Sequence, residues 1–157
     1  MGLAKRGKKP RAGRFVGIPY HVANSDVFSK LDAYEVKLLF DLSRQFNGRN
    51  NGNLTATLTL MESWGWASGT LHRTQKSLLE KGFITVTRQG WKQRGKPTLL
   101  ALTWHEIHEP PKTVEYDEGV KVSPVPLNYW CKDRSGWAHH IERPATESKP
   151  DPVAALG

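Results

Sequence analysis

The stretch from Ser68 to Gly82 constrains the fold most, because it predicts a helix that leads directly into a β-strand. On a helical wheel of about 100° per residue, Leu78 and Gly82 fall within about 20° of Leu71, so this side of the helix is expected to face the core. Ser68 is a favourable N-cap residue, and the helix is expected to run to about Lys81. Gly82 is expected to end it in a left-handed backbone conformation.

Two apolar runs after this helix predict a β-hairpin. The run FITVTRQ (residues 83–89) alternates side chains in the period-2 pattern of a strand, and TLLALTW (residues 98–104) is rich in apolar residues. The intervening GWKQRGKP is a long turn, with Pro97 at the mouth of the hairpin. We therefore expect an antiparallel pair of strands directly after the helix.

Three more elements are expected earlier in the chain. DAYEVKLLFDLSRQF repeats apolar residues at helical spacing, and Asp32 with Glu35 forms a carboxylate variant of the capping box, which predicts a helix over 33–46. A short extended piece at Leu54–Thr55 follows. LTLMESWGW then predicts a short second helix that ends at Gly65. The order helix, strand, helix, turn, helix, hairpin indicates an α+β domain.

Charge and composition divide the chain into three parts. The 157 residues carry a formal net charge of +8, and 38% of them are hydrophobic, enough for one modest core. Residues 1–14 form a basic arm that we expect to be flexible, and residues 15–107 hold nearly all the patterned apolar residues. Residues 108–157 hold seven of the ten prolines and are expected to be a mostly extended or disordered tail.

The same composition bounds the location of the protein. No stretch approaches the roughly 20 apolar residues that a membrane span needs, and the basic N-terminus has no apolar segment behind it. Cys131 is the single cysteine, which fits a reducing compartment. We expect a cytoplasmic protein that is not exported and has no membrane partner.

The side of the Ser68–Lys81 helix opposite Leu71 indicates DNA binding. The wheel places hydroxyl and cationic side chains there: Thr70, Arg73, Lys76 and Ser77. An α-helix fits the major groove of B-DNA, where arginine or lysine can pair with guanine and hydroxyl groups can reach phosphates or bases. The alternative is an ordinary solvated helix face.

The neighbourhood of this helix favours the DNA interpretation. Gly65 lies in a tight turn between two helices, as in a helix-turn-helix. The hairpin tip contains no acidic residue, and its cations would suit a wing on a phosphate backbone. The tip residues are Arg88, Trp91, Lys92, Arg94 and Lys96.

The run GNLTATLTLMESWGWASGTLHRTQKSLLEKGFITVTRQG resembles the winged helix-turn-helix of bacterial phages and other mobile elements, over roughly residues 15 to 105. The lead-in FVGIPYHVANSDVFSKLDAYEVKLLF resembles the start of phage replication-initiator DNA-binding domains. The resemblance implies three helices, a β-hairpin wing and a helix that reads DNA in GTLHRTQKSLLEKGFI. It implies DNA contacts from the helix and wing, to which the basic arm adds its own. By position, the resemblance implies contacts from Thr70, Arg73, Lys76 and Ser77 on the helix and from Arg88, Lys92, Arg94 and Lys96 on the wing. The full set of DNA contacts that we expect adds Ser68, Trp91 and, from the basic arm, Lys5, Arg6, Lys8, Lys9 and Arg11.

The six tryptophans have two expected roles. Trp64, Trp66 and Trp104 adjoin patterned apolar positions and are expected to close the core between helix and hairpin. Trp91 at the wing tip either stacks on a sugar or base or folds back over basic side chains. In the tail, VSPVPLNYWCKDRSGWAHHIERP is either a docking motif for a protein partner or a strap whose aromatic residues pack on the domain.

Catalysis, cofactors and metal are not expected. HEIH at 105–108, Cys131 and the histidine pair at 139–140 match no standard zinc spacing. No phosphate-binding glycine loop, carboxylate pair or nucleophile motif is present in the sequence, so we expect no enzyme.

The leading hypothesis is a double-stranded DNA-binding protein of a bacterial phage or mobile element, acting as a transcriptional regulator or replication-associated factor on nucleoid, plasmid or phage DNA. The rival is an adaptor whose winged domain does not bind DNA and whose tail docks a protein. RNA binding comes third, because an exposed aromatic strand platform is missing from the pattern. Homodimerisation, the target site and the sign of regulation are left open.

Overall fold

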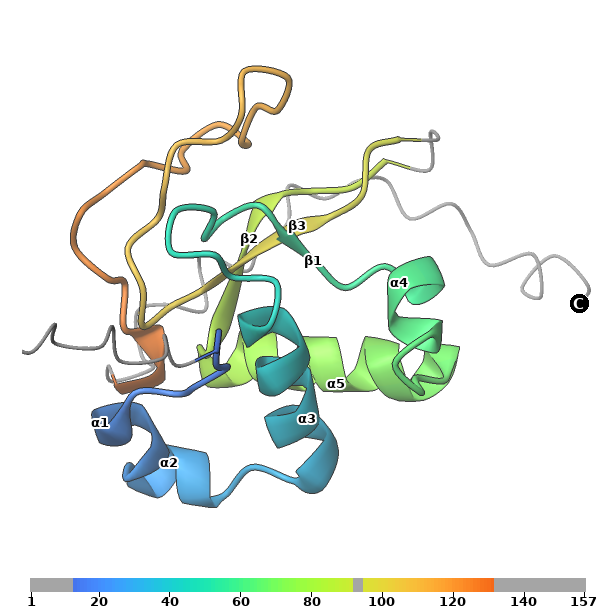
Figure 1. Cartoon of the computed structure of the whole chain (residues 1–157), viewed down its shortest axis with the longest axis vertical. Coiled ribbons are helices and arrows are strands. Elements are labelled where there is room, and N and C mark those ends of the chain that lie inside the picture. The colour runs from blue at the N-terminus through green and yellow to red at the C-terminus, as the bar shows by residue number, and fades with distance from the viewer. Residues whose placement is uncertain (1–12, 92–94, 132–157) are drawn as a thin grey trace, which may run out of the picture.

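The computed structural model describes residues 13–91 and 95–131, and it has a mixed α+β architecture (Figure 1). Three of its elements were not expected from the sequence: the one-turn helices α1 and α2 and the short 3-10 helix η1. Such short pieces leave no periodic pattern. The elements in chain order are α1 (Tyr20–Ala23), α2 (Asp26–Ser29), α3 (Ala33–Ser43), β1 (Leu54–Thr55), α4 (Leu58–Glu62), α5 (Ser68–Lys81), β2 (Ile84–Arg88), β3 (Leu99–Leu102) and η1 (Tyr129–Cys131).

Helix α3 begins with the predicted capping box. The Asp32 carboxylate accepts from the Glu35 backbone N–H at 2.8 Å, and the Glu35 carboxylate accepts from the Asp32 N–H at 2.8 Å. The helix ends at Ser43, three residues before the predicted end. Beyond it, the N–H groups of Gln45 and Phe46 bond to carbonyls three residues back, so the chain tightens into a turn.

Helix α5 has the predicted extent, but the prediction that Ser68 caps it is wrong. Ala67 occupies the N-cap, no side chain caps the helix, and Ser68 is its first residue. Gly82 ends the helix with φ +81°, as predicted. A Cβ on Gly82 would lie 2.7 Å from the carbonyl carbon of Tyr129, so the site needs glycine for space as well as conformation.

The three strands form one antiparallel sheet in the order β1-β3-β2. The predicted hairpin is β2 with β3, and β1 adds to the other edge of β3. Helices α3 and α5 lie on one side of the sheet (Figure 1). Their inward faces and the sheet share one core, whose fully buried side chains include Leu38, Leu78, Phe83, Ile84 and Leu100. This arrangement is compatible with a winged-helix-like fold.

The tryptophan predictions are largely confirmed. Trp66 and Trp104 are each 4% exposed and belong to the core, whereas Trp64 is half-buried and packs against its edge. Trp91 is 68% exposed.

The segment 108–131 has little regular structure but packs on the domain. An isolated bridge joins Ile107 to Ser123. At its end Trp130 is buried, and its ring stacks on Phe83 with centroids 6.2 Å apart and planes 9° apart. For Trp130 this matches the strap interpretation, while Trp137 lies outside the described residues.

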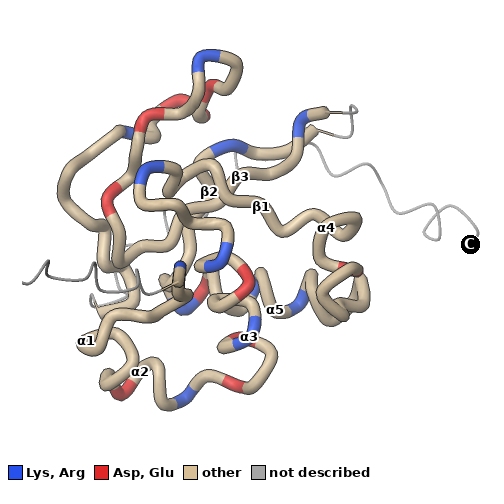
Figure 2. Tube along the Cα trace, in the orientation of Figure 1, with Lys and Arg blue, Asp and Glu red and all other residues tan. Residues whose placement is uncertain are grey.

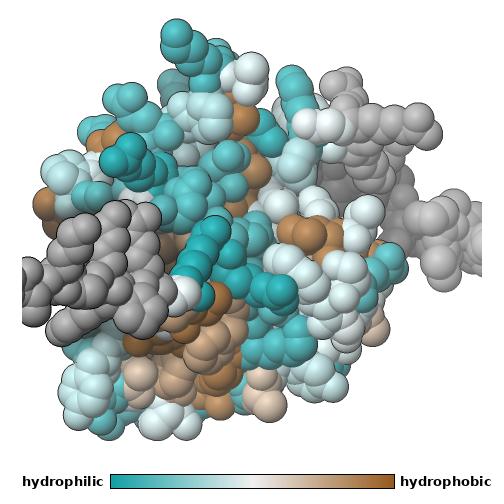
Figure 3. All heavy atoms as spheres, in the orientation of Figure 1, coloured by the Kyte–Doolittle hydropathy of each residue, from teal (hydrophilic) through white to brown (hydrophobic). Residues whose placement is uncertain are grey.

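An apolar area remains on the surface between the N-terminal segment, α2 and α3, drawn in brown (Figure 3). Large exposed apolar side chains from these segments include Phe15, Val16 and Phe40. In the part of the chain that is described, no helix is long and apolar enough to cross a membrane.

Candidate nucleic-acid interface

The outward face of α5 presents cations without competing partners. Arg73 and Lys76 are exposed, together with Gly69, His72 and Glu80. Within the described residues, Arg73 and Lys76 form no ion pair and no side-chain hydrogen bond. Their charges are therefore available to an anionic ligand.

The structure moves two of the predicted contacts off this face. Thr70 and Ser77 are only partly exposed, and the Ser77 hydroxyl donates to Glu35 on α3. The prediction that Ser77 points outward is wrong, because Thr74 is buried and the inward face of α5 therefore extends toward Ser77. The Thr74 hydroxyl donates to the Thr70 carbonyl at 2.7 Å, so this polar side chain is satisfied within the helix.

The sequence-based set also left out His72 and Glu80, which are exposed. Counting Thr74 among the inward residues rotates the buried face toward Ser77 and turns His72 outward. Glu80 already lies opposite Leu71 on the wheel and was omitted although the wheel places it there. Ser68, at the start of the helix, is exposed as well.

A buried carboxylate holds the C-terminal half of α5 against α3. Glu35 is 2% exposed and accepts from Lys81 Nζ at 2.6 and 2.8 Å, besides Ser77. Burial alone would raise the pKa of Glu35, but the hydrogen bonds from Lys81, Ser77 and the Asp32 N–H outweigh it and lower that pKa below its ordinary value of 4.5. Glu35 is therefore ionised at neutral pH.

A second buried carboxylate on α3 holds the turn that precedes α5. Asp41 accepts from Trp66 Nε1 at 2.7 Å and from Lys37 Nζ at 2.6 Å, and Lys37 Nζ also donates to the Trp64 carbonyl at 2.9 Å. Between the two tryptophans Gly65 has φ +86°, as expected for the tight turn. These bonds fix the direction in which α5 leaves α4.

The β2–β3 hairpin also carries cations, and one of the two that the structure describes is engaged by the backbone. Arg88 is partly buried and its Nη2 donates to the Pro97 carbonyl at 3.0 Å, whereas Lys96 is exposed. The Trp91 N–H bonds to the Lys96 carbonyl at 3.2 Å, which extends the pairing beyond the strands. Two further predicted contacts, Lys92 and Arg94, lie outside the described residues.

An acidic residue that the hairpin sequence does not contain lies beside it. Asp117 Oδ2 accepts from the Gln89 N–H at 2.6 Å, and the Asp117 N–H donates to the Thr87 carbonyl at 2.8 Å. Figure 2 shows acidic positions on the loop after β3, whereas the described part of the hairpin carries only basic ones. The acid-free tip in the sequence thus has a carboxylate neighbour in space.

The basic arm is seen only at its end. Arg14 Nη2 donates to the Phe46 carbonyl at 2.9 Å, so the arm leaves the domain near the end of α3. All the predicted arm contacts lie outside the described residues: Lys5, Arg6, Lys8, Lys9 and Arg11.

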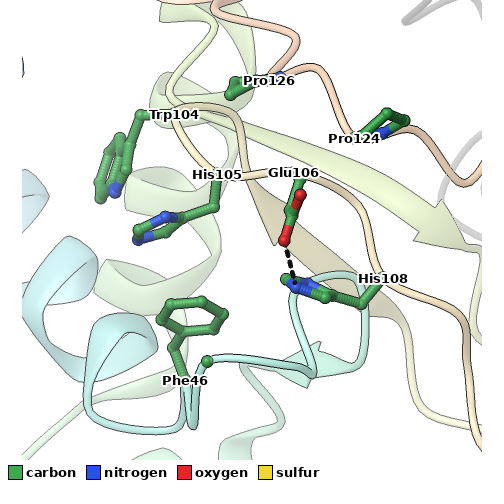
Figure 4. Close-up of a pocket in the computed structure, with 8 residues that line it drawn as sticks. Phe46, Trp104, His105, Glu106, His108, Pro124 and Pro126 are labelled. Carbon is green, nitrogen blue, oxygen red and sulfur yellow. Dashed lines mark ion pairs between the residues drawn. The ribbon is translucent and has the colours of Figure 1, made fainter.

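The HEIH motif lines a shallow pocket beyond the end of β3 (Figure 4). The His105 ring stacks on Phe46 with centroids 4.3 Å apart, and His108 Nε2 lies 3.0 Å from a Glu106 carboxylate oxygen. Burial lowers the pKa of His105, and the nearby His108 lowers it further, so His105 is a neutral packing group. Among the residues described, no group of three His, Cys, Asp or Glu side chains is placed to hold a metal ion.

Comparisons of the chain with protein-family models, with curated proteins and with solved structures found no match.

Proposed function

We propose that the chain binds double-stranded DNA as a winged helix-turn-helix protein. In this proposal α4, the turn at Gly65 and α5 form the helix-turn-helix, α5 enters the major groove, and the β2–β3 hairpin is the wing. The observation that carries the proposal is the outward face of α5, where Arg73 and Lys76 are exposed and unpaired on a helix held from behind by buried carboxylates. A rigid cationic helix matches the width and the acceptor groups of that groove.

The placement of the hairpin supports the same use. The end of the hairpin and the N-terminal end of α5 point to the same side of the molecule, with α4 between them (Figure 1). Lys96 at the hairpin end would then lie over a phosphate backbone while α5 contacts base edges. The basic arm would add affinity without sequence preference, because polybasic segments neutralise phosphates regardless of the bases.

The biological setting we propose is a phage or mobile element, in which the protein acts as a transcriptional regulator or a replication-associated factor. The support is the resemblance of the central segment and its lead-in to such proteins. One observation counts against the adaptor alternative: the outward cations of α5 form no contact within the domain that would explain them. Another counts for it: the carboxylate of Asp117 reduces the positive charge beside the hairpin.

The test is a titration of the full chain against random-sequence duplex DNA at increasing salt. If about six phosphates are neutralised, the logarithm of affinity should fall against the logarithm of salt with a slope near −5. Lys76→Glu should weaken binding strongly, whereas the matched reversal Lys30→Glu, on the exposed residue that follows α2, should weaken it little.

Two results would overturn the proposal. One is the lack of any duplex binding at low salt by the folded chain, which would favour the adaptor. The other is an equal loss from Lys76→Glu and Lys30→Glu, which would mean that net charge rather than the α5 face attracts DNA.

A further inference from the structure

The outward face of α5 offers a restricted set of hydrogen-bonding groups. Thr74 and Ser77 donate within the domain, as described above. The single amide side chain on α5, Gln75, is partly buried, and its Nε2 donates to the Ala56 carbonyl at 3.0 Å. Asparagine and glutamine are the side chains that pair with adenine in the major groove, so α5 keeps no free group of that kind.

Of the side chains that remain exposed on the middle of α5, the two cations favour one base. Arg73 and Lys76 are donors only, and guanine presents two acceptors, N7 and O6, in the major groove. Adenine presents one acceptor and one donor there, which a cation cannot match. His72 lies beside them with one donor in its neutral form, and Glu80 lies one helical turn beyond Lys76.

The spacing of the two cations along the helix suits neighbouring base pairs. Lys76 comes three positions after Arg73, a rise of about 4.5 Å along the helix axis. The rise of B-DNA is about 3.4 Å per base pair. Two long side chains this far apart can reach adjacent bases.

We propose that α5 reads two adjacent guanines, with Arg73 on N7 and O6 of one and Lys76 on the other. This inference rests on the proposed function and specifies the sequence that the protein prefers. Glu80 would stand near the groove edge and accept from a cytosine amino group or repel a phosphate.

The test begins with selection of preferred duplexes from a random library by the full chain. Each guanine of the selected site is then replaced singly by 7-deazaguanine, which keeps base pairing but loses the N7 acceptor. Replacement at two adjacent guanines should weaken binding about three- to tenfold each. The matched control, 7-deazaadenine at the adenines, should change affinity little.

Variants assign the two guanines. In Arg73→Ala the penalty at one of them should disappear while the other keeps its penalty, and Lys76→Ala should show the converse. Because both residues are exposed, the melting temperature of each variant should equal that of the natural chain, and measuring it shows that the variant is folded.

The inference is overturned by selected sites that lack adjacent guanines, by selection that enriches no site, or by affinity that is insensitive to 7-deazaguanine. In these cases binding to random duplex DNA remains, so the proposed function survives. If no duplex is bound at low salt, the proposed function and this inference fail together.

Discussion

The outward face of α5 and the β2–β3 hairpin both carry cations in the sequence, but the surroundings of these cations differ in the structure. Arg73 and Lys76 stand free on a helix whose position is set by buried hydrogen bonds. In the hairpin, Arg88 is engaged by Pro97 and Asp117 lies alongside. A pattern of charges in the sequence therefore does not identify a surface that recognises bases. Recognition also requires side chains on a fixed scaffold and hydrogen-bond donors that have no partner within the protein.

The outward face of α5 and the β2–β3 hairpin should accordingly have different functions in DNA binding. In the proposed DNA complex the helix would discriminate between sequences, and the hairpin would hold a phosphate backbone of any sequence.

The largest effect is expected from removing the anchor of α5. Glu35→Ala leaves Lys81 and Ser77 without their buried partner and should lower the free energy of unfolding by about 3–5 kcal/mol in urea denaturation. Glu62→Ala, an exposed carboxylate on α4, is the matched control and should change it by less than about 0.5 kcal/mol. Equal losses from the two variants would mean that Glu35 does not anchor the helix.

The same anchor makes stability depend on pH in one direction. Because the pKa of Glu35 is lower in the folded state, its contribution is complete above the ordinary carboxyl value of 4.5 and is lost as the pH falls below it toward the folded value. Unfolding curves of Glu35→Gln should show a weaker loss of stability over that window than the natural chain. An unchanged pH profile would contradict the role given to Glu35.

Bulk added to the outward face should separate stability from binding. A Cβ on Gly69 meets nothing within 4 Å, so Gly69→Leu should fit the free protein. Because Gly69 lies in the first turn of α5, the gain in stability should be below the value of about 0.8 kcal/mol for a helix interior. The side chain would stand between α5 and the groove, so DNA affinity should fall several-fold. Thermal melting and a duplex titration measure the two changes, and unimpaired binding would show that this face does not approach DNA.

A change at the hairpin should affect all sequences alike. Lys96→Ala should weaken preferred and random duplexes by the same factor and reduce the salt slope by about 0.9, as expected for one lost phosphate contact. A selective loss on the preferred site would instead give the hairpin a part in reading bases.

The smallest effect is expected from the carboxylate beside the hairpin. Asp117→Asn keeps an oxygen that can accept from Gln89 but removes a negative charge, so duplex affinity should rise by about twofold or less. Glu118→Gln, the next acidic residue in the chain, controls for the change in net charge. A larger gain from the control would place the DNA away from Asp117.

The order and type of the main elements were predictable from sequence because their signals are local. The capping box at Asp32 and the stop at Gly82 depend on residues a few positions apart, and both are seen in the structure. The inward turn of Thr74 was not predictable by hydropathy, since its hydroxyl is satisfied within the helix.

Contacts between segments far apart in the sequence were also not predicted. Gln45 pairs with the backbone of Thr55, and Asp117 reaches the hairpin across 28 positions of sequence. No periodicity or spacing reports such a pairing, because it arises from how the elements are placed in space. The surroundings of the candidate interface could therefore be described only from the structure, whereas its central cations, Arg73 and Lys76, were predicted from the sequence.

The most direct test of base reading by α5 compares Arg73→Ala with the natural chain on a selected duplex and on random duplex DNA. We expect Arg73→Ala to lose about 1–3 kcal/mol of binding free energy on the selected site and much less on random DNA, at an unchanged melting temperature. If a stably folded Arg73→Ala protein keeps its full preference for the selected site, α5 does not read DNA and its cations are an ordinary solvated face.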